Sequence, residues 1–247
     1  MRELEQAAKA MEEGDYPGAR RLIGALLAES PEPVRALALG LGARHAMDCG
    51  EDEAARPLLA EHELLVAQVF GPLSTQAGEA WALRARFHRL EGRPERAVEA
   101  SGRALRLLEG EARAACRLGL AEALLELGQA EEAAPVLVEA RREASPAQLA
   151  QAEPLQARAA LAMGLPRLAI GHAHAAIERS HALHGPDSPA FADAMLLLAA
   201  AYQAEGDLES ALAAADRAVA VLGRALGPEH PEVGLAAAWM LSLQEGV

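Results

Sequence analysis

A glycine followed five residues later by an alanine recurs six times along this chain of 247 residues. The pairs are Gly14/Ala19, Gly50/Ala55, Gly92/Ala97, Gly128/Ala133, Gly164/Ala169 and Gly206/Ala211. Successive glycines are 36, 42, 36, 36 and 42 residues apart, which suits one helix-turn-helix unit each. This period restricts the chain to a repeat architecture, because units of this size bury their apolar faces only by stacking on one another.

The segments on either side of each glycine read as helices. Around Gly206, apolar-periodic runs cover residues 191–205 and 207–222, and the glycine between them suits the left-handed cap that reverses the chain. We expect small alanines such as Ala211 and Ala218 where two helices approach closely. Hydrophobic residues make up 51% of the chain, mostly Ala and Leu, and aromatic residues only 3%. This composition favours packed helices and argues against disorder and against sheets.

Charge and hydropathy exclude several classes of function. The formal net charge of −13 repels phosphate backbones, so we expect no nucleic-acid partner. No apolar run of about 18 residues indicates a membrane span, and the opening residues do not resemble a signal peptide, so a cytoplasmic protein is expected. Cys49 and Cys116 lack metal or disulfide spacing, and we expect both to be small buried residues.

The pattern Gly206, Ala211, Ala215 and Ala218 resembles the tetratricopeptide repeat, and six such units in register extend over nearly the whole chain. Aromatic residues also stand where that family favours them, at Trp81 and Tyr202 on expected first helices. The resemblance implies an all-α fold, a right-handed superhelical α-α solenoid of about six helix pairs with a C-terminal capping helix.

Gly-Pro dipeptides mark the longer units. They occur at residues 71–72, 185–186 and 227–228, and together with the 42-residue intervals they resemble repeats of kinesin-light-chain type, which have extended second helices. That subfamily usually carries paired asparagines on the first helix for contacting peptide backbone. Leu196 and Leu197 occupy the corresponding positions here.

A longer repetition is also visible, because shifting the sequence by 114 residues aligns Gly50 with Gly164, Gly92 with Gly206 and the first Gly-Pro with the second. No Gly-, Ser- or Pro-rich linker separates the two blocks. We therefore predict one continuous solenoid over residues 1–247, with repeats centred on the six glycines and a cap over residues 231–244.

Candidate binding residues follow from the resemblance, which implies that the first helix of each pair lines a concave groove. The arginines expected there are Arg44, Arg86 and Arg158, each six residues before a repeat glycine, and Arg89 one turn beyond Arg86. The leucines expected beside them are Leu41, Leu83, Leu118, Leu155 and Leu197. The arginines would hold an acidic tail or an acidic or amphipathic helix of a partner, or they would pair with acidic side chains nearby. The leucines would contact the partner or belong to the core.

Residues for catalysis or metal binding form no recognisable motif. His174, Glu178 and His181 share one helical face, but the chain has no His-Glu-x-x-His, so we expect no metal site and no cofactor. The sequence therefore predicts a non-enzymatic adaptor or scaffold that binds a protein or peptide in its groove. The alternatives are a regulatory sensor of a small ligand or signalling peptide, and an atypical helical-repeat enzyme.

Overall fold

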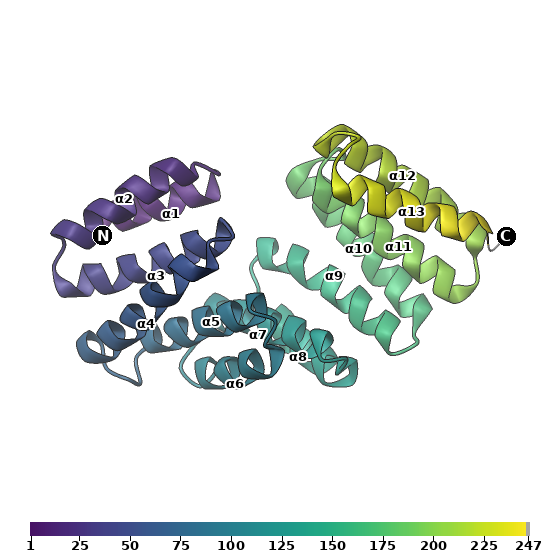
Figure 1. The fold of residues 1–247 in the computed structure, drawn as a ribbon. Helices are drawn as coiled ribbons and strands as arrows, with labels where there is room; N and C mark the ends of the chain where they lie inside the picture. The colour runs from purple at the N-terminus through teal and green to yellow at the C-terminus, as the bar shows by residue number, and fades with distance from the viewer. Residues whose placement is uncertain (246–247) are drawn as a thin grey trace. The chain divides into compact units, whose positions relative to one another are not determined.

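The computed structural model describes residues 1–245, in which we find thirteen α-helices and no strand. The first helices of successive pairs are α1 (Arg2–Glu12), α3 (Glu32–Asp48), α5 (Thr75–Leu90), α7 (Gly110–Glu126), α9 (Pro146–Ala162) and α11 (Pro189–Glu205). The second helices are α2 (Tyr16–Glu29), α4 (Asp52–Val69), α6 (Pro94–Ala104), α8 (Ala130–Glu143), α10 (Pro166–His184) and α12 (Leu208–Leu226). The last helix is α13 (Pro231–Glu245). Within a pair the helices run antiparallel, as Figure 1 shows, so the all-α repeat fold is confirmed.

The chain divides into two compact units, residues 1–123 and the residues from Leu124 onward. In the first unit, α1 contacts α3 and α3 contacts α5. In the second unit, α9 contacts α11, and α12 contacts α13. First helices therefore lie beside first helices in each unit, and we call the surface that they form the first-helix face. The single continuous solenoid, with α13 as its cap, stays a prediction.

The repeat glycines adopt the predicted conformation. All six have φ between +67° and +89°, a region that side chains other than glycine disfavour. At Gly206, the N–H of Asp207 donates to the carbonyl of Tyr202 across 3.0 Å, which closes the end of α11. Each alanine five residues after a repeat glycine is 0% exposed, as expected where helices approach closely.

The 114-residue offset recurs in the helix boundaries. Helices α8, α9, α10 and α11 begin 114 residues after α2, α3, α4 and α5. The second helices that precede Gly-Pro dipeptides are α4, α10 and α12, with 18, 19 and 19 residues, while α2, α6 and α8 have 14, 11 and 14. The expected extension of these second helices is confirmed.

A glycine at the interior of α5 sets a packing limit that can be tested. A Cβ at the buried Gly78 would lie 2.9 Å from the Leu107 Cβ and from the Leu108 Cδ2. We expect Gly78→Ala to lower the free energy of unfolding by about 1–3 kcal/mol, because the neighbouring backbone must move. Urea denaturation followed by circular dichroism measures the change.

The matched control is Gly171→Ala in α10, which is exposed and has no neighbouring heavy atom within 4 Å of an added Cβ. This substitution should raise the free energy of unfolding by about 0.5–1 kcal/mol, because alanine restricts the unfolded chain and favours helix. Equal effects of the two substitutions would contradict the close approach at Gly78.

Candidate functional site

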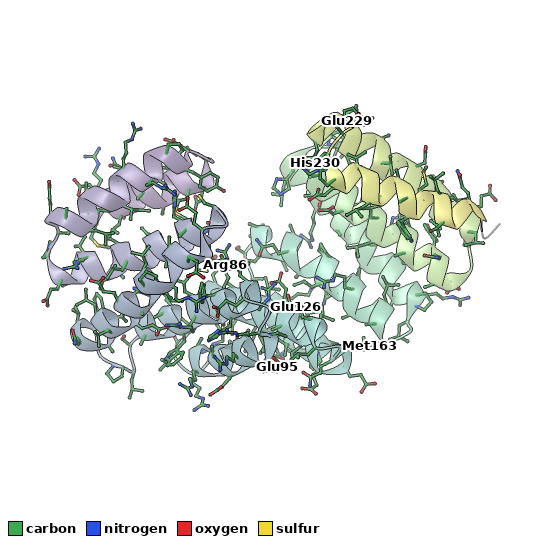
Figure 2. All side chains as sticks on the ribbon, viewed as in Figure 1. Arg86, Glu95, Glu126, Met163, Glu229 and His230 are labelled. Atoms are coloured by element: carbon green, nitrogen blue, oxygen red, sulfur yellow. The ribbon has the colours of Figure 1, made fainter. Side chains whose placement is uncertain are left out.

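The predicted arginines of the first unit lie on its first-helix face and are engaged in ion pairs. Arg86, labelled in Figure 2, extends from α5 to the carboxylate of Asp48 at the end of α3. The Nε of Arg44 is 3.9 Å from the same carboxylate. Arg89 pairs with Glu122 of α7. These contacts match the alternative given for the arginines, pairing with acidic neighbours, and their binding of a partner stays a prediction.

Arg158 of α9 differs from the other three. Its side chain is exposed, and among residues 1–245 it has no hydrogen bond or ion pair. In the first unit, Arg44 and Arg86 occupy the equivalent position six residues before a repeat glycine. Both pair with the carboxylate of Asp48. Arg158 is thus the predicted arginine that has no ion pair among the described residues.

The predicted leucines all take part in packing within the chain. Leu118 and Leu155 are buried. Leu41, Leu83 and Leu197 are partly buried against hydrophobic clusters of their own units. The surface that these leucines offer to a partner is therefore limited to the exposed parts of the last three.

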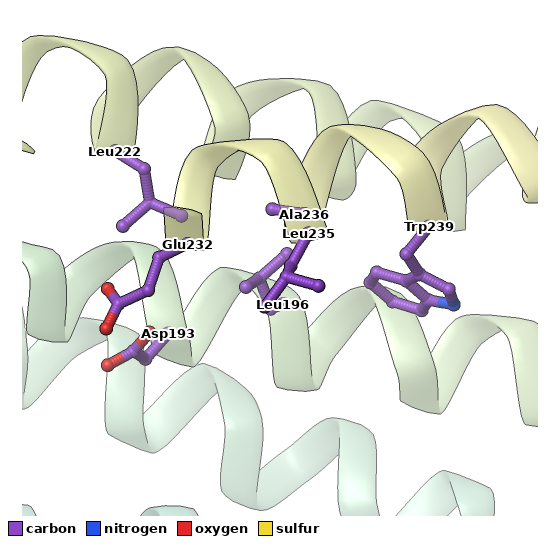
Figure 3. Close-up of a pocket in the computed structure, with 7 residues that line it drawn as sticks. All are labelled: Asp193, Leu196, Leu222, Glu232, Leu235, Ala236 and Trp239. Atoms are coloured by element: carbon purple, nitrogen blue, oxygen red, sulfur yellow. The ribbon is translucent and has the colours of Figure 1, made fainter. Parts of the chain in front are cut away.

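A pocket of about 280 Å³ lies in the second unit, between α11, α12 and α13. Its lining consists of Asp193, Leu196, Leu222, Glu232, Leu235, Ala236 and Trp239. Asp193 stands four residues before the predicted Leu197, so both lie on the same side of α11. Figure 3 shows Leu196 and Leu235 in the middle of the pocket and the indole of Trp239 at one end, with the two carboxylates and Leu222 at the other.

The two carboxylates of the pocket have no cation beside them. Among the described residues, neither Asp193 nor Glu232 has an ion pair, and no lining residue is basic. Burial raises the pKa of the Asp193 carboxyl above its ordinary value of 3.8, and the negative charge of Glu232 raises it further. One end of the pocket therefore carries two solvent-exposed acidic residues without an ionic partner among the described residues.

A leucine of the pocket lining is itself exposed to solvent. Leu235 of α13 is 73% exposed. The sequence predicted α13 as a cap but did not predict the pocket. The two helices that supply the carboxylates of the pocket, α11 and α13, begin 42 residues apart. One sequence signal could have pointed to it. Leu235 stands one 42-residue repeat after Asp193, so α13 has an apolar residue at the position where α11 has an acidic one.

A buried polar cluster was also missed, and we call it the Glu153 cluster. Glu153 of α9 is 2% exposed, and its Oε1 lies 2.9 Å from Arg141 Nη1 and 3.5 Å from Arg179 Nε. Its Oε2 lies 3.1 Å from His172 Nδ1, and Gln156 accepts a second hydrogen bond from Arg141 at 2.6 Å. The cluster joins α8, α9 and α10.

The charge of Glu153 is stabilised despite its burial. Burial acts to raise the pKa of this carboxyl, but the hydrogen bond with His172 and the charges of Arg141, His172 and Arg179 together hold the pKa below its ordinary value. The sequence signal for the cluster is the 114-residue offset, which aligns Arg141, Glu153, His172 and Arg179 with Leu27, Leu39, Leu58 and Leu65. Four charged or ionisable residues replace four leucines.

The histidines and cysteines form no candidate metal site within residues 1–245. His174 Nε2 is 3.5 Å from the Tyr202 hydroxyl, and no group of three or more His, Cys, Asp or Glu side chains in the described residues is arranged to hold a metal ion. Cys116 is buried, and burial raises the pKa of its thiol to about 11. Cys49 is exposed in the turn after α3, so the expectation that both cysteines are buried is wrong for this one.

Known structures share this fold at low sequence identity. A crystal structure of the putative kinesin light chain repeats of Podosopora anserina has a TM-score of 0.62 and 22% identity, covering 79% of this chain and 98% of that one. BtubC from P. vanneervenii has a TM-score of 0.66 and 22% identity, covering 93% of each chain. The apo quorum sensor NprR from B. thuringiensis has a TM-score of 0.73 and 13% identity, covering 98% of this chain and 68% of that one.

The stacked helix pairs and the first-helix faces define an α-helical repeat protein. Residues 191–232 match the family model of the tetratricopeptide repeat. That match and the shared fold confirm the recognition of tetratricopeptide repeats, including the kinesin-light-chain-like units of 42 residues. None of the curated proteins matches the sequence. No helix in residues 1–245 is both long enough and apolar enough to cross a membrane.

Proposed function

We propose that the chain is a non-enzymatic adaptor or scaffold that binds a protein or peptide segment on the first-helix face of its second unit. The observation that carries the proposal is the pocket between α11 and α13, whose apolar lining includes the exposed Leu235. Exposed apolar side chains beside a pocket are typical of interaction sites. Repeat solenoids generally use such surfaces to bind other proteins.

The size of the pocket favours a segment of a protein over a small ligand. Pockets that enclose small molecules usually have volumes of about 300–1,000 Å³. The pocket here has about 280 Å³, just below this range. Its lining contains no histidine, cysteine, serine or lysine, and beside its two carboxylates it offers no hydroxyl, amide or further charged side chain to orient a substrate, so binding is favoured over catalysis. An adaptor is therefore preferred to a small-ligand sensor and to an enzyme.

Arg158 extends the proposed surface on α9. Because it has no partner among the described residues, it is available for the acidic group of a bound segment. Arg44, Arg86 and Arg89 would have to exchange existing carboxylate partners to do the same. The proposed contribution of these three arginines is correspondingly smaller.

Quantitative affinity capture from the source organism tests this function. We expect a protein recovered in stoichiometric amount with the wild type and with Leu73→Glu, a matched change at an exposed leucine between α4 and α5. Leu235→Glu should reduce recovery at least tenfold, because a carboxylate is introduced at the apolar mouth of the pocket. Arg158→Glu should give a smaller reduction.

Circular dichroism and thermal melting check that each variant folds. Failure to recover any protein or peptide with the wild type would overturn the proposed function. Equal recovery with Leu235→Glu and Leu73→Glu would overturn its location at the pocket.

A further inference from the structure

The charges of the α11–α13 pocket are opposite to those expected for a groove that binds acidic partners. Asp193 and Glu232 face each other at one end of the pocket (Figure 3), and no cation among residues 1–245 pairs with either. The arginines of α12 are engaged elsewhere, Arg224 with Asp187 at 2.8 Å and Arg217 over the Phe191 ring at 5.3 Å. No side chain among the described residues neutralises this end of the pocket, so a cationic group of a bound molecule would meet no competing ionic partner there.

The remainder of the pocket is apolar. Leu196, Leu235 and Trp239 follow the carboxylates along the pocket, and Leu222, which is 1% exposed, lies at the carboxylate end. A long side chain with an apolar stem and a cationic head suits this arrangement, because the stem covers the leucines while the head reaches the carboxylates. The indole ring offers a face to a neighbouring apolar or cationic group.

We propose that this pocket takes an arginine or lysine side chain of a partner protein, flanked by an apolar residue that packs on Leu235 and Trp239. The proposal rests on the proposed function and gives the bound segment its chemistry, a basic and amphipathic one. Arginine fits better than lysine, because its planar fork can donate to two carboxylates at once. Arg158 on α9 would contact a different, acidic position of the same partner.

The net charge of −13 makes a simple affinity for basic peptides uninformative, since any cation is attracted at long range. The test therefore compares arginine with citrulline, which has nearly the same shape and no charge. The probe is a set of acetylated, amidated 12-residue amphipathic peptides of leucine, alanine and glutamine with one central arginine, citrulline or glutamate. Binding is followed by the fluorescence of Trp239 in the full chain carrying Trp81→Phe, which leaves Trp239 as the one tryptophan.

We expect the arginine peptide to bind about tenfold more tightly than the citrulline peptide, and the glutamate peptide to bind most weakly. The variant Asp193→Asn/Glu232→Gln should reduce the arginine preference to less than about threefold, because the charged hydrogen bonds are lost. The control Glu209→Gln/Asp216→Asn removes the same charge from exposed positions of α12 outside the pocket lining and should keep the preference.

An arginine preference that is equal in the pocket variant and in the control variant would overturn the proposal, because long-range attraction then explains it. Equal affinity for all three peptides would overturn it as well. If Leu235→Glu still releases a captured protein in that case, the proposed function stands and only the basic character of the segment fails. If neither a protein nor a peptide binds, both fail.

Discussion

Replacing both arginines of the Glu153 cluster with leucine, as Arg141→Leu/Arg179→Leu, is expected to lower the free energy of unfolding of the second unit by about 3 kcal/mol. The substitution leaves the carboxylate of Glu153, which is 2% exposed, with His172 Nδ1 at 3.1 Å as its remaining polar partner. The two arginine side chains are themselves about one-third exposed, at 36% and 35%, so the loss lies toward the lower end of the range for buried ion pairs. Urea denaturation at pH 7 measures it.

The first unit supplies the matched control. Its residues at the 114-residue offset are leucines, and Leu39 at the position of Glu153 is 2% exposed. Changing Arg141, Glu153, His172 and Arg179 to leucine together, with Gln156→Ala, should therefore restore at least the stability of the wild type. Apolar residues of similar volume often replace buried ion pairs at no cost. If this variant is less stable than the double arginine variant, a general packing defect explains the loss and the ionic account is wrong.

The pH dependence of the Glu153 cluster follows from the lowered pKa of its carboxyl. A carboxyl with a depressed pKa in the folded state contributes stability above its ordinary pKa, here 4.5, and loses that contribution as the pH falls through the folded value. The wild type should therefore lose stability relative to the all-leucine variant below about pH 4.5. Parallel curves for the two proteins from pH 6 to pH 3 would contradict this assignment.

Replacing Phe191 with alanine is expected to lower the free energy of unfolding of the second unit by about 3–5 kcal/mol. Phe191 is 2% exposed at the start of α11, where it belongs to the core cluster that also contains Val221, Leu222 and Leu243. Its ring also lies 5.3 Å from the guanidinium carbon of Arg217 and 6.1 Å from the His181 ring. Alanine leaves a cavity and removes both ring contacts.

Phe191→Leu separates these two effects. Leucine fills most of the volume but has no ring, so we expect a loss of about 1–2 kcal/mol, of which the cation–π contact supplies up to about 1 kcal/mol. Thermal melting and urea denaturation of the full chain measure both variants. A loss for Phe191→Ala no larger than that for Phe191→Leu would show that α11 is not anchored through this side chain.

The helix pairs were predictable from sequence because they are local. Gly206 and Ala211 lie five residues apart, and the same spacing recurs in all six repeats. The residue that forms the turn and the residue at the contact between the two helices therefore lie within one short segment. The Gly-Pro dipeptides likewise mark the longer second helices, such as α10. Helix α9 begins 114 residues after α3, because the same local sequence signals start both helices.

The character of the candidate site depends on contacts between distant segments. Arg86 was expected in a groove, but its charge is satisfied by Asp48, 38 residues earlier in the chain. Nothing in the sequence distinguishes Asp193 and Glu232 from the other acidic residues. Only the packing of α13 beside α11 places them at one end of an apolar pocket.

The sequence by itself determined that this protein is a stack of antiparallel helix pairs, because glycine caps and alanine contacts act over a few residues. Only the tertiary structure decided which charges are neutralised and which remain for a partner. The reason is that electrostatic pairing depends on distances of a few Å between side chains far apart in the chain. Arg158 and the Asp193–Glu232 pair are left without ionic partners among the described residues, whereas Glu153 is enclosed by them.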